Sequence, residues 1–346
     1  MNFKKIALYL PLIALVAVSY FGYKVYNIVF TKNTSFTEKE IFVYVPTNSD
    51  FNSLLTIIAP YIKDIEKFKS LAEQRGLIHN VIPGKFILTN GMNTNDIVTS
   101  LRRSVPVKVR FNNQERLEDF VGRISTQLEV DSLALLTTIK DKRFLEEHKM
   151  TEAAVISMFM PNTYEFYWDV TPTKFRDKLA KEYYKFWTDE KVAQAKEQGL
   201  SPLEAVTLAS IVQKETAKVD ERPRVAKVYL NRLKIGMPLQ ADPTVIYAFK
   251  QETNNFNQVI KRVYYKHLEV ANPYNTYRNI GLPPGPIFMP DVSSIDAVLS
   301  PEQHNYIYFC ASVTNFGYHD FATTLSEHNI NAKKYANWLN KQTAVK

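Results

Sequence analysis

Glu215 is the residue best placed in this chain for acid–base chemistry. It lies near the end of a helix predicted to begin at Pro202, because Ser201 and Glu204 form a capping box with proline at the first helical position. At about 100° per residue, Glu215 falls within the apolar arc of this helix, close to Ile211. Burial and the negative end of the helix dipole both raise the pKa of a carboxyl group placed there, which suits a general acid.

The same position allows a purely structural interpretation. A carboxylate that faces a core can instead pair with a nearby cation, and Arg222 and Arg224 follow closely in the chain. The polar Thr207, Ser210 and Lys214 are expected on the opposite side of the helix. Helical geometry alone leaves the acid and the ion pair as alternatives.

The composition is that of a folded, basic protein. The chain has 346 residues, 45% hydrophobic and 23% charged, with a net charge of +8. The excess of positive charge favours anionic partners, whether nucleic acid, membrane surface or acidic polymer. The single cysteine, Cys310, excludes an intrachain disulfide framework.

The amino-terminal segment predicts a membrane anchor. Lys4 and Lys5 precede an uncharged run, so we expect a cytoplasmic N-terminus at 1–5 and a transmembrane helix at 6–28. A cleaved signal peptide is the alternative, because Ala17-Val18-Ser19 resembles a cleavage site. Either way the remaining chain is expected on the exported side of the cytoplasmic (inner) membrane, which argues against a nucleic-acid partner.

Residues 31–105 predict a small α+β module. A strand at 41–45, helices at 50–59 and 62–75 with Gly76 as C-cap, a strand at 84–88 and a helix ending at Arg103 follow in order. This order resembles that of LysM-like modules, which bind or orient on glycan chains. A spacer between membrane and catalytic domain is the alternative.

Residues 106–346 predict a larger mixed α+β domain. Its expected elements are a strand at 107–111, a helix at 115–128, an aromatic strand near 161–166, and helices at 174–198 and 222–234. Two proline-rich segments, 237–244 and 272–286, are expected to form rigid turns of the kind that binding loops need.

Four segments of this domain, in this order, resemble the endolytic murein transglycosylase (YceG-like) family. They are LASIVQKET at 208–216, VYLNRLKIGMPLQADPTVIYA at 228–248, PYNTY at 273–277 and GLPPGPI at 281–287. The resemblance implies a lyase that cleaves peptidoglycan strands internally, between N-acetylmuramic acid and N-acetylglucosamine, leaving a 1,6-anhydro end. It also implies an inner-membrane anchor and action near peptidoglycan synthases.

The resemblance assigns roles to individual residues. The catalytic glutamate of the family maps onto Glu215, and a glutamate that is usual two positions earlier is Gln213 here. Because Gln213 lies on a different face of the helix, we do not expect the difference to affect catalysis. The residues implied to border the substrate cleft are Gln240, Asp242, Thr244, Asn275, Thr276 and Tyr277.

A single carboxyl group can perform this reaction. Ordinary glycosidases need two carboxylates, but here the 6-hydroxyl of the muramic acid attacks its own anomeric carbon. Glu215 would act first as acid and then as base, with no cofactor and no metal. His319 and His328 do not have zinc-ligand spacing, and we expect them to be structural or to line the cleft.

Two other functions fit the same residues. One is a non-catalytic peptidoglycan-binding scaffold for synthesis enzymes. The other is a hydrolase in which Asp242 activates water.

Overall fold

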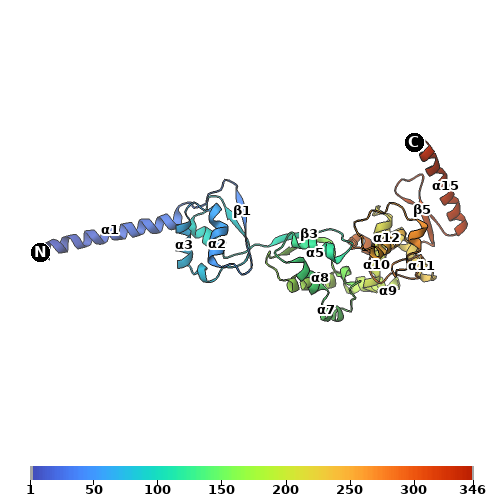
Figure 1. Ribbon diagram of the computed structural model, residues 1–346, viewed down its shortest axis with the longest axis horizontal. Coiled ribbons are helices and arrows are strands. Elements are labelled where there is room, and N and C mark those ends of the chain that lie inside the picture. Colours follow the sequence, from blue (N-terminus) through green and yellow to red (C-terminus); the bar gives the residue numbers. More distant parts are fainter. Residues whose placement is uncertain (1–2, 345–346) are drawn as a thin grey trace. The chain divides into compact units, whose positions relative to one another are not determined.

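The computed structural model describes residues 3–344, so Met1 and Asn2 of the predicted cytoplasmic segment lie outside it. The protein has a mixed α+β fold with three small two-stranded sheets among the described residues. It divides into two compact units (Figure 1). The first comprises 1–109 with the later segments 124–130 and 164–171, and the second comprises 110–123, 131–163 and 172–346.

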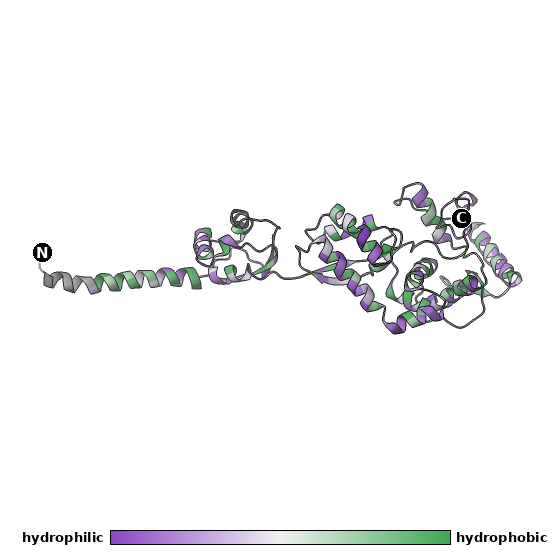
Figure 2. Cartoon of the chain, turned by 90° about the horizontal axis from the view of Figure 1, so that it is seen from below, coloured by the Kyte–Doolittle hydropathy of each residue, from purple (hydrophilic) through white to green (hydrophobic). Residues whose placement is uncertain are grey.

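The first unit begins with the apolar helix α1 (Phe3–Phe30). Its segment Pro11–Phe30, with a mean hydropathy of 1.5, is long and apolar enough to cross a membrane. Figure 2 shows hydrophobic residues along most of this stretch. A signal sequence near an N-terminus has the same length and composition, so a membrane anchor and a cleaved signal peptide share this feature.

The rest of the first unit follows the predicted element order. Strands β1 (Glu40–Val45) and β2 (Gly84–Thr89) pair antiparallel, with Val43 opposite Phe86. Helices α2 (Phe51–Ile58), α3 (Ile65–Gln74) and α4 (Thr94–Ser100) complete its core. Gly76 adopts the left-handed conformation expected of a C-cap, with φ of 70°. The second helix begins later than predicted because Asp64 caps it and accepts from the amide of Lys67.

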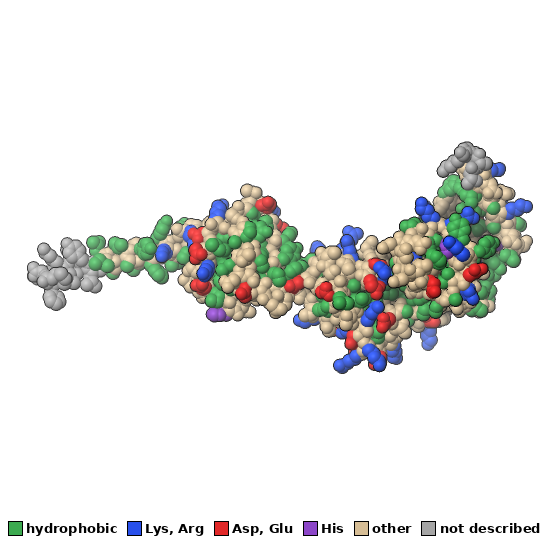
Figure 3. Space-filling model, in the orientation of Figure 1, with side chains coloured by type: hydrophobic (Ala, Val, Ile, Leu, Met, Phe, Trp, Pro, Cys, Tyr) green, Lys and Arg blue, Asp and Glu red, His purple; other side chains and the backbone are tan. Residues whose placement is uncertain are grey.

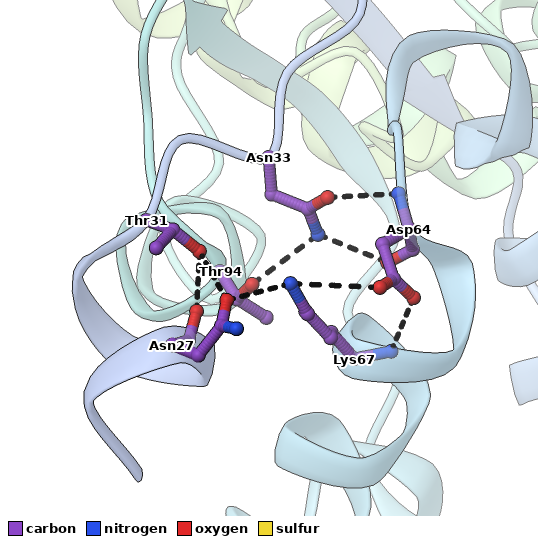
Figure 4. A network of polar contacts seen from close by, with 6 residues as sticks. All are labelled: Asn27, Thr31, Asn33, Asp64, Lys67 and Thr94. Carbon is purple, nitrogen blue, oxygen red and sulfur yellow. Dashed lines mark hydrogen bonds and ion pairs between the residues drawn. The ribbon is translucent and has the colours of Figure 1, made fainter. Parts of the chain in front are cut away.

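Polar side chains join the end of α1 to this module (Figure 4). Lys67 Nζ donates to Asn27 Oδ1 at 2.8 Å. Asn33, which is 2% exposed, donates to the carbonyl of Asp64 at 3.0 Å and to Thr94 Oγ1 at 3.2 Å, and accepts from the amide of Asp64 at 2.8 Å. The last turn of α1 is therefore joined to α3, and the segment that follows it is joined to α4 and to the start of α3.

The second unit has an aromatic core in its first half. Phe120 packs against Phe111, Phe159 and Phe175 with ring centroids 4.8–6.1 Å apart. The helices of this region are α5 (Leu117–Ser125), α6 (Ser132–Ile139), α7 (Lys142–Glu147), α8 (Pro172–Phe186) and α9 (Asp189–Glu197). The strands β3 (Val107–Phe111) and β4 (Asn162–Phe166) have residues in each of the two units. Helices α6 and α7 and the 3₁₀ turn Val155–Met158 were not predicted, because none is longer than 8 residues, which is too short to show a helical period.

Helix α10 (Pro202–Glu215) lies at the centre of the second half. It packs against α11 (Arg222–Lys234), α12 (Asp242–Glu252) and α14 (Val292–Leu299) (Figure 1). The remaining elements are α13 (Tyr265–Leu268), the hairpin of β5 (Tyr308–Ala311) and β6 (His319–Ala322), and α15 (Leu325–Ala344). The predicted turn at 237–244 is partly wrong: Asp242 and Pro243 already begin α12, since proline is favoured in a first helical turn.

Candidate active site

Helix α10 presents Glu215 from its last turn. The predicted capping box is present, with the Ser201 side chain accepting from the amide of Glu204, and the helix ends because Thr216 is extended. Two of the three polar residues expected on the other side of this helix are buried as well. Thr207 and Ser210 are 2% and 0% exposed, because Thr207 donates to its own helix and Ser210 Oγ accepts from the amide of Ile287.

Glu215 is half-buried as a residue, and one of its carboxyl oxygens lies in the interior. Its Oε1 is inaccessible to solvent and has no hydrogen-bond partner within residues 3–344. Burial raises the pKa of Glu215 to about 7, against the opposing effect of the Tyr229 hydroxyl. The carboxylate of Asp242 adds to the increase, while His319 and Arg232 reduce it. The predicted upward pKa shift is confirmed, and near neutral pH the group exchanges a proton readily.

The alternative of an ion pair with Arg222 or Arg224 is not realised. Arg222 donates to Ser293 Oγ at 2.8 Å and lies 3.8 Å from Asp291, and Arg224 pairs with Glu302 at 3.0 Å.

The basic group near Glu215 is Arg232, which was not predicted from the sequence. It shares a face of α11 with Tyr229 at i and i+3, a spacing that could have indicated it. Its Nε donates to the carbonyl of Ile307 at 2.7 Å and its Nη1 to that of Leu239 at 2.5 Å. Burial lowers the pKa of Arg232. These bonds fix the guanidinium, so its positive charge is held at a constant place beside the acid.

Three of the six residues predicted at the cleft are buried inside the loops that form it. Thr244, Asn275 and Thr276 are 0%, 0% and 1% exposed. The hydroxyls of Thr244 and Thr276 lie 2.8 Å apart, and Asn275 Nδ2 donates to the carbonyls of Leu268 and Val270 at 2.9 Å each. The bond between the two threonines joins the start of α12 to the 272–277 loop, and Asn275 joins this loop to the chain just before it. The three residues therefore support the site and do not face a ligand.

The other three predicted residues are accessible. The Tyr277 hydroxyl donates to Asp242 Oδ1 at 2.7 Å, and burial, followed by this hydrogen bond, raises the pKa of Tyr277. Asp242 is exposed, and so is Gln240, whose φ of 50° places it in the left-handed region. The Gln240 amide donates to the carbonyl of Thr276 at 3.1 Å, which compensates for part of the strain. An exposed acid thus lies close to the buried one.

The β5–β6 hairpin is joined to the start of α11 by Glu221, which is 3% exposed. Glu221 Oε1 accepts from the amide of His319 at 2.7 Å, and its Oε2 lies 2.9 Å from His319 Nδ1. Burial acts to raise the pKa of Glu221, but the hydrogen bonds from His319 and Thr216 outweigh it, so the pKa is lowered. His319 is thus held by a carboxylate, and His328 stacks on Tyr308 at 5.3 Å. Within the described residues no three His, Cys, Asp or Glu side chains are arranged to hold a metal ion.

Comparison with known proteins shows the family of this chain. The model of the YceG-like family matches residues 43–334, which include both units and every residue of the site. The chain belongs to the YceG-like family.

Two relatives of this YceG-like chain share a name. A protein of Bacillus subtilis called endolytic murein transglycosylase is 27% identical over 319 residues, covering 87% of this chain and 86% of its own length. A protein of that name from Streptococcus pneumoniae is 32% identical over 142 residues, 41% of this chain and 25% of its own length. A crystal structure of a YceG-like protein from Listeria monocytogenes has a TM-score of 0.55 and 28% identity, covering 85% of this chain and 99% of the other.

Gln213 has a structural partner away from Glu215. Its Nε2 donates to Asp291 Oδ2 at 2.7 Å, and its Oε1 accepts from the Asp291 amide at 2.6 Å and from Ser294 Oγ at 2.9 Å. An amide suits this place because it donates to a carboxylate and accepts from two donors at once. The glutamine therefore ties α10 to the start of α14.

Proposed function

We propose that this YceG-like chain is a lytic transglycosylase that cleaves peptidoglycan strands internally, between N-acetylmuramic acid and N-acetylglucosamine. The observation that carries the proposal is the buried carboxyl group of Glu215, whose pKa of about 7 lets it hold a proton at neutral pH and take it back. The name shared by the relatives from Bacillus subtilis and Streptococcus pneumoniae supports the same activity.

In the proposed reaction, Glu215 first donates its proton to the glycosidic oxygen, and the bond from that oxygen to the anomeric carbon of the muramic acid breaks. The 6-hydroxyl oxygen of the same sugar then bonds to the anomeric carbon, and its proton passes to the Glu215 carboxylate. The products are a 1,6-anhydro end and a strand with a free 4-hydroxyl, and Glu215 regains its proton. No water is consumed, so a second carboxylate is not needed as a base.

The accessible residues of the site are proposed to contact the sugar. Asp242 and Tyr277, joined by their hydrogen bond, can orient a sugar hydroxyl and stabilise positive charge at the anomeric carbon. Gln240 adds an exposed amide from the same loop. Thr244, Asn275 and Thr276, which were expected to border the cleft, are proposed to position its loops, because their polar groups are buried and bonded within the loops.

We further propose that α1 is an uncleaved, single-pass anchor in the cytoplasmic membrane, with a cytoplasmic N-terminus and the remaining chain exported. The apolar run supports retention of the helix, because it continues past the possible cleavage site at 17–19 to Phe30. In this proposal 31–105 is a LysM-like module, 106–346 is the catalytic domain, and the anchor brings both close to peptidoglycan synthases. Protease added outside intact cells should digest an exported tag at the C-terminus and spare one at the N-terminus; the opposite pattern would reject this orientation.

Product analysis tests the activity. Full-length protein in detergent is incubated with uncrosslinked glycan strands, and the products are identified by mass spectrometry. Wild type should yield anhydro ends, and Glu215→Gln should lower the rate at least about 100-fold. Glu252→Gln, at an exposed position on α12, is the matched control and should retain the activity. Reducing ends instead of anhydro ends would indicate a hydrolase, and strand binding without any product would indicate a scaffold.

A further inference from the structure

A cavity of about 570 Å³ lies beside α12 in the second unit. One wall is aromatic: Tyr247 packs against Tyr274 with ring centroids 4.7 Å apart and against Phe256 at 5.7 Å. Tyr274 is 4% exposed, so this wall is fixed by the core behind it. Such a surface binds the apolar faces and methyl groups of a ligand without a large loss of side-chain entropy.

A second, smaller cavity of about 160 Å³ adjoins this one. Glu115 and Tyr247 line both cavities, and the smaller one is also lined by Lys214 and Pro243. These last two residues are the chain neighbours of Glu215 and Asp242. Positions 243, 246, 247, 250 and 251 of α12 recur at helical spacing along both cavities. At about 1.5 Å per residue, α12 therefore provides a continuous floor about 12 Å long.

The rim of the larger cavity carries charges of both signs. Lys140 lies 3.5 Å from Glu118 and 3.3 Å from Glu152, and its side chain is 32% exposed. The guanidinium of Arg116 lies over the ring of Phe256 at 4.6 Å. Figure 3 shows basic and acidic side chains interspersed over this unit. Because exposed ion pairs contribute little to stability, these groups can exchange their partners for those of a ligand.

Charges of both signs around an aromatic wall fit a ligand that is itself doubly charged. The charged groups of the rim pair with one another, and Arg116 pairs with Asp119 at 2.6 Å. A neutral N-acetylated sugar offers only hydroxyl and amide partners and would not replace these ion pairs, whereas a ligand with charges of both signs would. The peptide that N-acetylmuramic acid carries has free carboxylates and a free amine. Its carboxylates would pair with Arg116 and Lys140 and its amine with Glu118 or Glu152.

We propose that the cavity beside α12 binds the stem peptide of the strand while the scissile bond lies at Glu215. The proposal rests on the proposed function, since it names a further part of the same substrate. It makes the protein selective for strands that still carry their peptides, because the smaller cavity links peptide and bond over one face of α12.

A binding experiment tests the proposal without catalysis. Full-length Glu215→Gln protein in detergent is titrated by calorimetry with a synthetic stem pentapeptide that has free carboxylates and a free side-chain amine. Lys140→Glu, added to that protein, should weaken binding at least about tenfold, the usual effect of losing one charge-assisted bond. Lys142→Glu is the matched control, because its side chain is 90% exposed and it does not line the cavity. Arg116→Gln is the second variant, should Lys140→Glu fail to fold, and it should weaken binding in the same way.

A kinetic experiment gives the independent readout. Wild type should cleave stem-bearing strands with a kcat/KM at least about tenfold above that for strands from which an amidase has removed the peptides. Lys140→Glu should raise KM for stem-bearing strands and leave cleavage of stemless strands unchanged. Absence of peptide binding, or an equal loss on both strands, would overturn the proposal. Failure of wild type to cleave either strand would reject the proposed function instead, and the peptide titration would still decide whether the cavity binds the stem.

Discussion

Replacing Glu215 by glutamine is expected to remove a pH dependence from the stability of the protein. Burial raises the pKa of this carboxyl group from 4.5 to about 7. The difference between these values, at about 1.36 kcal/mol for each pH unit, amounts to about 3 kcal/mol. This is the free energy by which ionisation of Glu215 destabilises the folded state, and a neutral amide of the same shape does not incur it.

The sign of the effect depends on which state releases its proton first. Below pH 4.5 the carboxyl group is neutral in the folded and in the unfolded chain, so it makes no difference. Between pH 4.5 and about 7 the unfolded chain loses the proton while the folded protein keeps it, so stability falls as the pH rises. Above about pH 7 both states are ionised and the loss is complete. Glu215→Gln should therefore be stabilising at pH 8 and close to neutral at pH 4.

The measurement is urea unfolding of the full-length protein in detergent, followed by near-ultraviolet circular dichroism between pH 4 and pH 8. The free energy of unfolding of Glu215→Gln, minus that of wild type, should increase by about 3 kcal/mol over this range. Glu252→Gln serves as the control and should follow wild type, because Glu252 is exposed. Parallel curves for wild type and Glu215→Gln would refute the inference that this carboxyl group is held neutral by burial.

Two further substitutions test the supports of the site. Gln213→Glu should lower the free energy of unfolding by about 1–3 kcal/mol at pH 7, because it removes the donor 2.7 Å from Asp291 and places two carboxylates together. When unfolding is measured at pH 4, most of this loss of stability should disappear, because the carboxylates then take up protons. Gly285→Ala should lower stability by about 1–3 kcal/mol, because an added Cβ would lie 2.4 Å from the carbonyl oxygen of Ala153. Gly122→Ala is the control, because Gly122 lies in the interior of α5 and no atom lies within 4 Å of the new Cβ. Thermal denaturation of both variants should show a loss of stability for Gly285→Ala and none for Gly122→Ala. An equal loss of stability in the two variants would contradict the steric explanation.

Local patterns in the sequence located the helices that carry the site. The capping box at Ser201 sets the start of α10, and the apolar arc of that helix indicated that Glu215 faces inward. Its raised pKa followed from this placement, because burial and the helix end act through the local environment of one side chain. The sequence also predicted the order of strands and helices in the first module, because capping or turn residues mark the ends of these elements.

The partners of these residues come from distant parts of the chain, and no local pattern reports them. Thr244, Asn275 and Thr276 carry polar side chains in proline-rich segments, which suggests a binding loop, yet all three are buried. Thr244 and Thr276 bond each other across 32 residues, and Asn275 bonds the carbonyls of Leu268 and Val270. Arg232, and not Arg222 or Arg224, is the arginine beside the acid, because the face of α11 that packs on α10 selects it.

The sequence by itself determined that one glutamate lies at the inner end of a well-capped helix, within a chain whose motifs are those of the YceG-like family. Only the tertiary structure decided which groups surround that glutamate, which predicted residues face solvent, and where a ligand can extend beyond them. The physical reason is range: capping and helical periodicity act over a few residues, whereas burial and hydrogen bonding between loops depend on how α10, α11, α12 and α14 pack together.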